Sequence, residues 1–300
     1  MIIQEVELES LKKANVKLHI LRLDLIPQKV TGNKWFKLKY NIQAAKKHSK
    51  NPLVTFGGAF SNHLYAFASA CKAFGFSGIA YVRGDGMDWN NPTLTKLVDS
   101  KINLHFIDRK TYRIKESPEF KSRILKDYPN AWIIPEGGSN QEGLIGCQEI
   151  LPRELPFDRI TVAAGTGCTA AGIIKTSPVL VEVYSALKGV FLQQEIKNII
   201  GEDNKFLYMN KYHFGGFAKT NKNLIDFINS FYRQTGIPLD PIYTGKMMYG
   251  IMEQVNNHIF ADGYKILAVH TGGLQGILGY NYLHKDCPIK IPYQDLNLPQ

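Results

Sequence analysis

Three lysines and two large aromatic side chains lie within residues 32–39, which read GNKWFKLK. A lysine amine can form a Schiff base with an aldehyde where apolar groups or cations disfavour its ammonium form. Lys34 follows Gly32 and Asn33 directly, and Lys37 follows at a spacing that shares a helical face. One lysine could carry an aldehyde cofactor while the other pairs with a phosphate. The alternative interpretation of this segment alone is the basic face of a solvated helix.

A second candidate feature is a turn that could hold the phosphate of such a cofactor. Residues 162–172 read VAAGTGCTAAG, an expected strand that runs through small residues into a helix. Gly165 and Gly167 let the backbone approach a ligand, and the N–H groups of the helix start would face an anion. Thr166 and Thr169 add hydroxyl donors. The ending of a Walker loop and the third glycine of a dinucleotide fingerprint are missing, which disfavours a nucleotide site.

Two further segments have the same order of strand, paired glycines and helix. They are TFGGAFSNH at residues 55–63 and HTGGLQG at residues 270–276. Because the carboxyl ends of parallel strands meet at one edge of a sheet, we expect the three turns to face one crevice. Each turn alone could be a packing turn, but several around one crevice favour a bound cofactor.

The elements that must position these residues alternate along the chain. Short apolar runs that end in glycine are followed by helical patterns, which is typical of βα units around a mostly parallel sheet. After the strand at residues 52–58, Ser61 or Asn62 would cap a helix and Gly75 would end it. Asn91 would cap a later helix, with Pro92 in its first turn. A second series runs from FDRITVAAGTG to YKILAVHTGG. The sequence therefore predicts an α/β fold of two open, mostly parallel-sheet domains.

The proline-rich stretch LPRELPFD at residues 151–158 predicts a domain boundary. A chain of 300 residues suits one large domain or two smaller ones. We expect a small α/β domain at residues 40–155, inserted into a large cofactor-binding domain made of residues 1–39 and 156–300.

The charge of the chain admits anionic partners but selects none. The formal net charge is +10, which could suit nucleic acid or small anionic ligands. The densest basic run, KKHSK at residues 46–50, is typical of a solvated helix end. No zinc spacing, RNP-like strand or basic-zipper pattern accompanies it. Nucleic-acid binding is therefore the weaker alternative, and we predict no nucleic-acid partner.

Composition also limits location and redox chemistry. The apolar runs are far shorter than the ~18 to 20 residues that cross a bilayer, and the first residues lack a signal peptide's basic-then-apolar order. The four cysteines are scattered, without CxxC spacing or the density of a disulfide scaffold. We predict a cytoplasmic protein that binds neither membrane nor metal.

Six motifs in order resemble one known family. The motifs are GNKWFKLK, TFGGAFSNH, IPEGGSN, VAAGTGCTAAG, DPIYTGK and HTGGLQG. Together they are similar to the 1-aminocyclopropane-1-carboxylate deaminase / D-cysteine desulfhydrase family, pyridoxal-phosphate enzymes of the tryptophan-synthase-β-like fold. The resemblance extends from about residue 20 to about residue 285. It implies pyridoxal 5'-phosphate as cofactor, a small amino acid as substrate and a homodimer.

The resemblance implies roles for the first two motifs. Lys34 would be the Schiff-base lysine, and Lys37 would approach the phosphate. Ser61, Asn62 and His63 match a segment in which the asparagine contacts the cofactor's 3-oxygen and its neighbours meet the substrate carboxylate.

The later motifs supply the rest of the expected site. The phosphate loop would comprise Ala164, Gly165, Thr166, Gly167, Cys168 and Thr169. Tyr243 matches the active-site tyrosine, and Thr271 would lie beneath the cofactor ring. Lys34, Tyr243 and Ser61 are the expected catalytic residues, although Tyr243 could equally be a core tyrosine with one hydrogen bond.

The residue after the tyrosine separates the family's substrates. Members that open the cyclopropane ring resemble one another in carrying a glutamate there, which keeps the pyridine nitrogen protonated. Here Thr244 takes that place, and either it or Thr271 could meet the nitrogen. A hydroxyl partner suits β-elimination, so D-cysteine, giving pyruvate, sulfide and ammonia, is the leading candidate. The alternatives are 1-aminocyclopropane-1-carboxylate deamination, another β-substituted amino acid of either hand, and a non-catalytic pyridoxal-phosphate-binding or regulatory protein.

Two residues depart from the family pattern. Phe36 stands where arginine is common, and Cys168 replaces a glycine of the phosphate loop. The first removes a cation beside the lysine, and the second adds bulk where backbone must approach phosphate. His270 is interpreted as structural, since nothing pairs it with a nucleophile.

Overall fold

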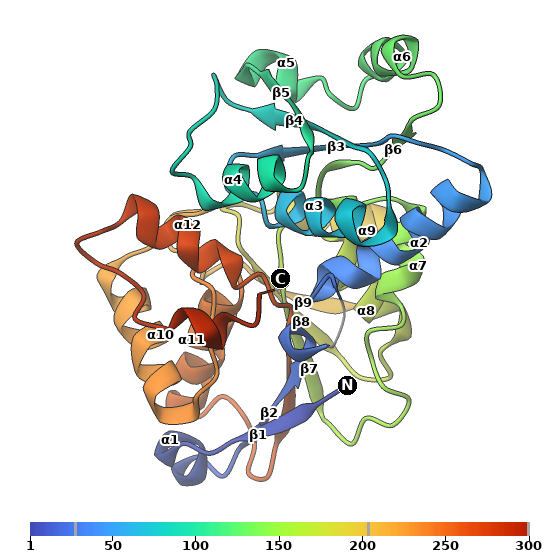
Figure 1. Cartoon of the computed structure of the whole chain (residues 1–300). Helices are drawn as coiled ribbons and strands as arrows, with labels where there is room; N and C mark the ends of the chain where they lie inside the picture. Colours follow the sequence, from blue (N-terminus) through green and yellow to red (C-terminus); the bar gives the residue numbers. More distant parts are fainter. Residues whose placement is uncertain (27–28, 203–204, 299–300) are drawn as a thin grey trace. The chain divides into compact units, whose positions relative to one another are not determined.

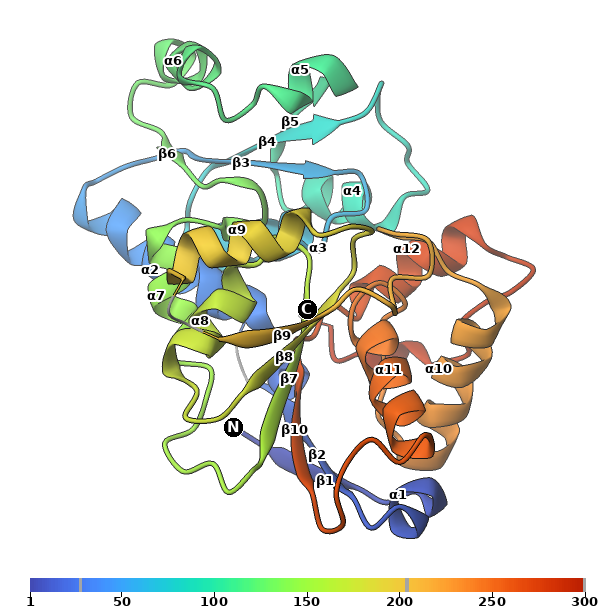
Figure 2. The ribbon, with the colours of Figure 1, turned by 180° about the vertical axis from the view of Figure 1, so that it is seen from behind.

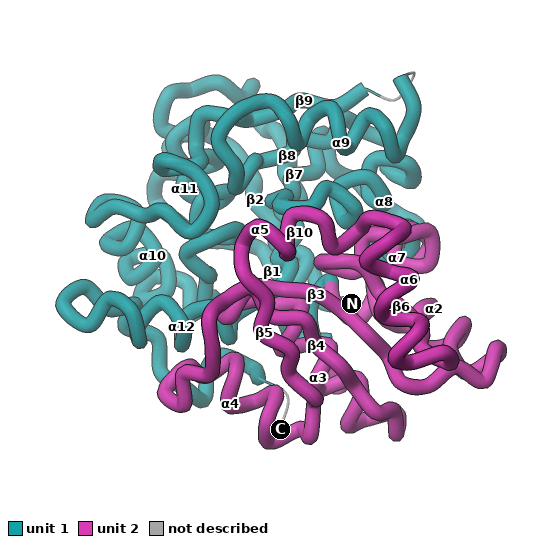
Figure 3. The backbone as a smooth tube through the Cα atoms, turned by 90° about the horizontal axis from the view of Figure 1, so that it is seen from above, with its two compact units in different colours: residues 1–27, 31–33, 147–298 teal, residues 28–30, 34–146, 299–300 magenta. Residues whose placement is uncertain are grey.

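The computed structural model of the chain (Figure 1) describes residues 1–26, 29–202 and 205–298. The chain divides into two compact units, which Figure 3 distinguishes by colour. Unit 1 comprises Met1–Pro27, Thr31–Asn33 and Cys147–Leu298; unit 2 comprises Gln28–Val30, Lys34–Gly146 and Pro299–Gln300. Each unit contains one mostly or wholly parallel sheet with helices. The predicted α/β fold class is thereby confirmed.

The sheet of unit 1 has the strand order β1-β2-β10-β7-β8-β9. Its strands are β1 (Ile3–Val6), β2 (Lys17–Arg22), β7 (Arg159–Ala164), β8 (Val181–Ser185), β9 (Phe206–Met209) and β10 (Lys265–His270). Only β1 and β2 pair antiparallel. The register of the parallel pair β10 and β7 places Val269 beside Val162. The turns that follow these two strands therefore leave the sheet side by side.

Helices cover both faces of this sheet. They are α1 (Glu9–Lys13), α8 (Cys168–Thr176), α9 (Phe191–Ile200), α10 (Lys222–Thr235), α11 (Thr244–Asn256) and α12 (Gln275–Leu283), with 3-10 turns η1 (Leu23–Leu25) and η3 (Tyr293–Leu296). Figure 2 shows α10 and α11 on one side of the sheet and α8 and α9 on the other. In α11, Met248, Ile251 and Val255 recur at helical spacing and enter the core that also contains Ile266 of β10.

Unit 2 has a fully parallel sheet in the order β5-β4-β3-β6. Its strands are β3 (Leu53–Gly58), β4 (Gly78–Arg83), β5 (Asn103–Ile107) and β6 (Trp132–Ile133). Its helices are α2 (Asn33–Lys47), α3 (Asn62–Phe74), α4 (Pro92–Asp99), α5 (Arg109–Arg113), α6 (Pro118–Asp127) and α7 (Gln141–Cys147), with the 3-10 turn η2 (Glu136–Gly138). The first residue of α2 belongs to unit 1 and the last of α7 likewise.

Side chains of β3 alternate between two cores, as the two-residue period of a strand requires. Leu53 enters the core that α2, α3 and α4 cover, whereas Val54 and Phe56 pack with Phe120 of α6. Figure 1 shows α3 and α4 on one side of the sheet and α5 and α6 on the other. Both faces of the central strand are therefore buried.

The predicted ends of two helices are confirmed. Ser61 caps α3 by accepting hydrogen bonds from the N–H groups of His63 and Leu64, and Gly75 ends the helix at φ +73°. Asn91 caps α4 in the same way, with Pro92 in its first turn. In the part of the chain that the structure describes, no helix is long and apolar enough to span a membrane.

Candidate active site

The expected phosphate loop joins β7 to α8 in unit 1. Gly167 precedes the helix at φ +80°, a conformation that glycine adopts without strain. A methyl group at this position would also lie 2.9 Å from Cγ1 of Ile196. As a glycine, the N-cap residue Gly167 has no side chain to cap the start of α8. The first turn of an α-helix has N–H groups without intrahelical partners, so this start suits an anion.

Thr169 in the first turn of α8 is oriented by two donors. Its Oγ1 accepts hydrogen bonds from Nδ2 of Asn33 at 2.9 Å and from Sγ of Cys147 at 3.8 Å. Since a hydroxyl accepts two bonds and donates one, its proton remains for a further acceptor such as a phosphate oxygen. Cys168, the first residue of α8, is buried. Its side chain therefore adds bulk to the core beneath the helix start.

The Gly-Asn pair before Lys34 is fixed against two of the predicted turns. The N–H of Gly32 donates to the carbonyl of Leu23, and that of Asn33 donates to the carbonyl of Thr271 at 2.9 Å. Gly32 has φ +69°, and a methyl group there would collide with the Thr271 carbonyl. Through its side chain Asn33 also reaches Thr169. Asn33 thus hydrogen-bonds both to the residue after β10 and to the phosphate loop.

Lys34 follows Asn33 in the chain and begins the unit 2 part of α2. Consecutive Cα atoms across a trans peptide are about 3.8 Å apart. Lys34 is therefore the residue that follows one whose side chain contacts the phosphate loop. The contacts that Gly32 and Asn33 make within unit 1 account for the glycine and the asparagine before the lysine.

Tyr243 lies against the phosphate loop. A methyl group at Gly165 would be 2.9 Å from Cε1 of Tyr243 and 3.0 Å from its hydroxyl oxygen. The loop backbone and the phenol can therefore approach each other only because residue 165 has no side chain. This places the predicted active-site tyrosine beside the predicted phosphate site within unit 1.

Asp240 fixes the backbone around Tyr243. Its buried carboxylate accepts hydrogen bonds from the N–H groups of Ile242, Tyr243 and Thr244, each at 2.8 to 2.9 Å. It also accepts the hydroxyl proton of Thr244 at 2.6 Å, and its own N–H donates back to that hydroxyl at 2.9 Å. The start of α11 is thus occupied by a carboxylate from the chain itself. The hydroxyl proton of Thr244, which is 0 % exposed, is already given to Asp240.

A buried ionic group supports the turn at Thr271. His270 contacts the Pro238 carbonyl through Nε2 at 2.7 Å, and its Nδ1 lies 3.2 Å from Oδ1 of Asp24. Arg22 donates to both oxygens of the same carboxylate. Burial raises the pKa of Asp24, but its interactions with the neighbouring His270 and with the hydrogen-bonded guanidinium of Arg22 outweigh burial, so that the pKa lies below its usual value. These contacts agree with the structural interpretation of His270.

In unit 2 two buried acceptor atoms at the start of α3 have no hydrogen-bond partner among the described residues. The Thr55 hydroxyl donates to the Ile134 carbonyl at 2.8 Å, so it must accept from Nε2 of His63, also at 2.8 Å. Nδ1 of His63 is then an acceptor, and among the described residues this buried atom has no hydrogen-bond partner. Oδ1 of Asn62 is likewise buried without one.

Two lysines act on His63 electrostatically. Burial lowers the pKa of His63 well below its usual value, and the charges of Lys34 and Lys37 lower it further. A methyl group at Gly138 would lie 3.2 Å from Cβ of Lys37 and 3.5 Å from Cε1 of His63. His63 is therefore a neutral imidazole with an open acceptor. It would contact a substrate carboxylate through Nδ1 only after gaining a proton there.

The predicted site residues thus form two groups, one in each unit. Unit 1 brings the loop Ala164–Thr169 together with Tyr243 and, through Asn33, with Thr271. Unit 2 brings Lys34 and Lys37 into electrostatic range of His63, beside Ser61 and Asn62. Thr244 is placed beside Tyr243, but its hydroxyl faces Asp240.

Sequence reasoning assigned no role to three supporting residues of the site, namely Asn33, Thr55 and Asp240. Asp240 could have been found, because aspartate is a preferred capping residue whose carboxylate accepts from the N–H groups two and three residues on. The roles of Asn33 and Thr55 could not be predicted from their own motifs, because their partners Thr169 and Ile134 lie far along the chain.

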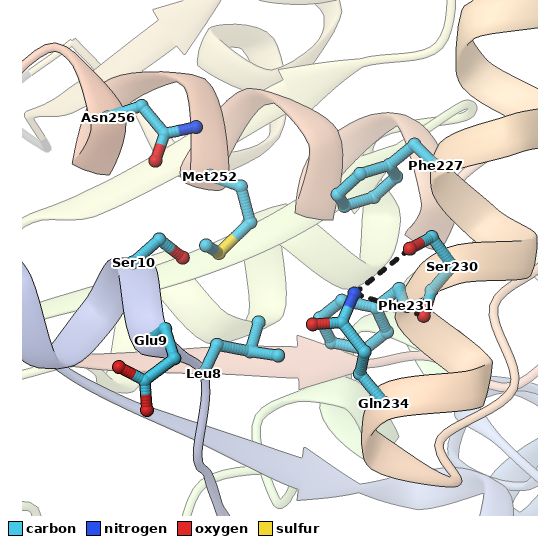
Figure 4. A pocket seen from close by; sticks show the side chains of 9 residues that line it. All are labelled: Leu8, Glu9, Ser10, Phe227, Ser230, Phe231, Gln234, Met252 and Asn256. Atoms are coloured by element: carbon cyan, nitrogen blue, oxygen red, sulfur yellow. Dashed lines mark hydrogen bonds between the residues drawn. The ribbon is translucent and has the colours of Figure 1, made fainter.

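A pocket of about 310 Å³ also lies in unit 1, at the far end of α11 from Tyr243. Figure 4 shows Met252 and Asn256 of α11 facing Ser10 and Leu8, with the Gln234 amide bonded to Ser230. None of the predicted site residues lines it. Among the described residues there is also no cluster of three or more His, Cys, Asp or Glu side chains that could hold a metal ion.

Solved structures confirm the predicted tryptophan-synthase-β-like fold. A crystal structure described as a homologue of 1-aminocyclopropane-1-carboxylate (ACC) deaminase superposes with a TM-score of 0.81 at 26 % identity. The superposition covers 95 % of this chain and 91 % of that one. A pyridoxal 5'-phosphate-dependent aspartate racemase shares the fold, with a TM-score of 0.64 at 16 % identity over 87 % of this chain and 85 % of its own. The chain therefore has the α/β fold of pyridoxal-phosphate-dependent enzymes such as this racemase.

Relatives in sequence narrow the class of enzyme further. A Pyrococcus abyssi protein provisionally named 1-aminocyclopropane-1-carboxylate deaminase is 27 % identical over 294 residues, 90 % of this chain and 88 % of its own. The D-cysteine desulfhydrase of Klebsiella pneumoniae is 26 % identical over 294 residues, 88 % of this chain and 89 % of its own. No family model matches the chain. The chain is a homologue of these deaminases and desulfhydrases over nearly its whole length, which confirms the resemblance in the six motifs and the prediction of an enzyme of this kind.

Proposed function

We propose that the protein is a pyridoxal-phosphate-dependent lyase that eliminates the β-substituent of a small amino acid, with D-cysteine as the leading substrate. The relatives support the class of enzyme and include both desulfhydrases and deaminases. The observation that carries the proposal is the position of Asn33. Its backbone binds the Thr271 carbonyl and its side chain binds Thr169 of the phosphate loop, and the next residue is Lys34.

The residues of unit 1 fit the phosphate group of the cofactor. The start of α8 has no side-chain cap, Gly165 and Gly167 leave the backbone accessible, and the proton of Thr169 is available to an anion. These are the donors that a phosphate needs at a helix start. We assign the loop Ala164–Thr169 to the phosphate and Lys34 to the covalent attachment of the cofactor, with Lys37, Asn62 and Thr271 as further cofactor contacts.

When bound, pyridoxal phosphate withdraws electrons from the α-carbon of the amino acid attached to it. We assign removal of the α-proton to the Lys34 amine and the donation of a proton to the leaving sulfur to the Tyr243 hydroxyl. Ser61 and His63 would bind the substrate carboxylate. Because His63 is neutral with its one ring proton on Nε2, it would do so only after taking up a second proton, on Nδ1. In sum, D-cysteine and water give pyruvate, hydrogen sulfide and ammonia.

The contacts of Thr244 favour elimination over ring opening. The resemblance associates ring opening with a carboxylate after the tyrosine. Here Thr244 offers neither a carboxylate nor a spare proton, because its hydroxyl donates to Asp240. Deamination of 1-aminocyclopropane-1-carboxylate is the second candidate, because the Pyrococcus abyssi relative and the structure with the TM-score of 0.81 carry that name. We also propose a homodimer, as the resemblance implies, and a cytoplasmic location, which the scattered cysteines support.

The test begins with an absorbance spectrum above 400 nm of the purified, cofactor-supplemented protein. Sulfide and pyruvate are then assayed with D-cysteine, and 2-oxobutyrate with 1-aminocyclopropane-1-carboxylate. We expect a band and equal amounts of sulfide and pyruvate in the wild type, and neither in Lys34→Ala. Lys47→Ala, an exposed lysine on the same helix, is the matched control and should keep both. A wild type without a band would refute the proposal, and a band with 2-oxobutyrate alone would establish the second candidate.

A further inference from the structure

A strained turn lies beside Tyr243 in unit 1. Residues 213–217, here called the 213–217 turn, include Phe214 at φ +53°, Gly215 at +97° and Gly216 at +121°, and Ala218 follows at +56°. Two of these four residues carry side chains that disfavour such a backbone. A turn of this kind needs support from outside itself.

Lys246 of α11 provides that support. Its Nζ donates to the carbonyls of His213 at 2.8 Å and of Gly216 at 2.9 Å. The residue is only 2 % exposed. Burial lowers its pKa to about 8, against the opposing effect of Asp240. A buried ammonium is costly unless hydrogen-bonded, so the two carbonyls and the lysine depend on one another.

The turn presents an aromatic ring next to the predicted site. Phe217 is 50 % exposed, and its ring centroid lies 6.2 Å from that of Tyr243 at an interplanar angle of 62°. Tyr243 in turn lies against Gly165 of the phosphate loop. Lys246 stands three residues after Tyr243 at the start of α11. The same helix start therefore holds the tyrosine and, through the lysine, the phenylalanine.

Building on the proposed function, we propose that Lys246 is a positioning residue that holds Phe217 beside Tyr243, and that the Phe217 ring contacts the side chain of the substrate. An aromatic face suits an uncharged substituent, including one with sulfur. The substrate class that follows is an amino acid with a small, uncharged β-substituent. A carboxylate side chain would lose its hydration against the negative face of this ring without gaining a partner.

The first experiment measures side-chain selectivity by binding. The inhibition constants of D-alanine and D-2-aminobutyrate, which differ by one methylene, are compared in the cofactor-loaded protein. Burying one methylene corresponds to about a fourfold difference in affinity. We expect D-2-aminobutyrate to bind about fourfold more tightly in the wild type. The ratio should fall toward one in Phe217→Ala and Lys246→Met. Lys222→Met, which removes an exposed lysine paired with Asp226, should leave it unchanged.

The second experiment does not depend on cofactor or turnover. Hydrogen exchange of the peptide around residues 210–220 is measured in cofactor-free protein. There the N–H of Gly216 donates to the His213 carbonyl and that of Lys219 donates to the Gly216 carbonyl. We expect exchange about tenfold faster in Lys246→Met than in the wild type or Lys222→Met. Unchanged exchange would overturn the positioning role of Lys246.

The two experiments separate this inference from the proposed function. A wild type without an absorbance band refutes the function, while hydrogen exchange still tests the hold of Lys246 on the turn. A wild type that turns over D-cysteine, but whose Phe217→Ala variant keeps the fourfold ratio, retains the function and overturns the side-chain contact. Because Phe217 is half exposed, Phe217→Ala should fold even if Lys246→Met does not.

Discussion

The starts of α8 and α3 follow the same sequence pattern of strand, glycine and helix, yet their hydrogen bonds differ. The start of α8 has a glycine at φ +80° and no side-chain cap, so its N–H groups suit an outside anion. The start of α3 is capped by Ser61, and its open groups are two buried acceptors, on Asn62 and His63. The start of α8 therefore suits a group that accepts hydrogen bonds, and the start of α3 suits groups that donate them. A shared pattern therefore does not imply a shared ligand.

The largest expected effect is at Gly167. Gly167→Ala places a side chain at φ +80° and against Ile196, so the backbone at the start of α8 must move. We expect cofactor affinity to fall about 100-fold, or about 2.7 kcal/mol, as measured by absorbance titration. Gly75→Ala is the matched control, because Gly75 has φ +73° with nothing within 4 Å of the added methyl. It should lower the free energy of unfolding by about 1 kcal/mol and leave affinity unchanged. Equal affinity losses in both variants would show that backbone strain alone is responsible.

The next effect concerns the link from Asn33 to the phosphate loop. Asn33→Ala removes the 2.9 Å bond to Thr169, and Thr169→Val removes its acceptor together with the proposed donor to the phosphate. We expect kcat to fall about tenfold in Asn33→Ala, equivalent to about 1.4 kcal/mol. The cofactor affinity should fall more in Thr169→Val. In the double variant the losses should be less than additive, since both changes break one bond. Fully additive losses would mean that the bond does not connect the two motifs.

What the sequence could predict here is mostly local. The caps Ser61 and Asn91 and the terminating Gly75 were predicted because capping depends on residues within one turn of each other. The glycine turns at residues 165–167 and 271–273 were found for the same reason, because a positive φ needs a glycine at that position.

What the sequence could not predict depends on distant partners. Asn33 and Thr169 are 136 residues apart, and Lys246 lies 30 residues from Gly216. Such pairs follow only from how strands order themselves in a sheet. The role of Thr244 shows the same limit, because the position after the tyrosine suggested a cofactor contact, whereas its hydroxyl proton goes to Asp240. The identity of a residue indicates its chemistry, and its neighbours decide whether that chemistry is available.

A smaller effect is expected at the start of α3, the second of the two helix starts compared above. Ser61→Ala removes the cap of α3, which accepts from the N–H groups of His63 and Leu64. We expect the free energy of unfolding to fall by about 1 kcal/mol, measured by urea denaturation. Ser61→Thr keeps a capping hydroxyl and should retain most of that stability. If Ser61→Ala lowers activity more than Ser61→Thr at equal cofactor content, the hydroxyl has a second role at the substrate carboxylate. A stability loss near zero would show that the cap does not hold α3.

The smallest effect is a pH dependence that originates at His63. Its pKa in the folded protein lies well below the usual value of 6.5, because of burial and the charges of Lys34 and Lys37. Below pH 6.5 the unfolded chain takes up a proton at this residue that the folded protein does not. Folding is therefore fully favoured by this group above pH 6.5 and is weakened as the pH falls below it, by up to about 1.4 kcal/mol per unit. His19, whose pKa burial also lowers, adds to the same trend.

The test compares the pH dependence of unfolding in two variants. His63→Gln should flatten the decline in the free energy of unfolding between pH 6.5 and 5.5 by about 1 kcal/mol, whereas His19→Gln leaves the contribution of His63 in place. If His63→Gln declined as steeply as the wild type, His63 would be protonated in the folded protein, and the start of α3 would offer a donor just as α8 does.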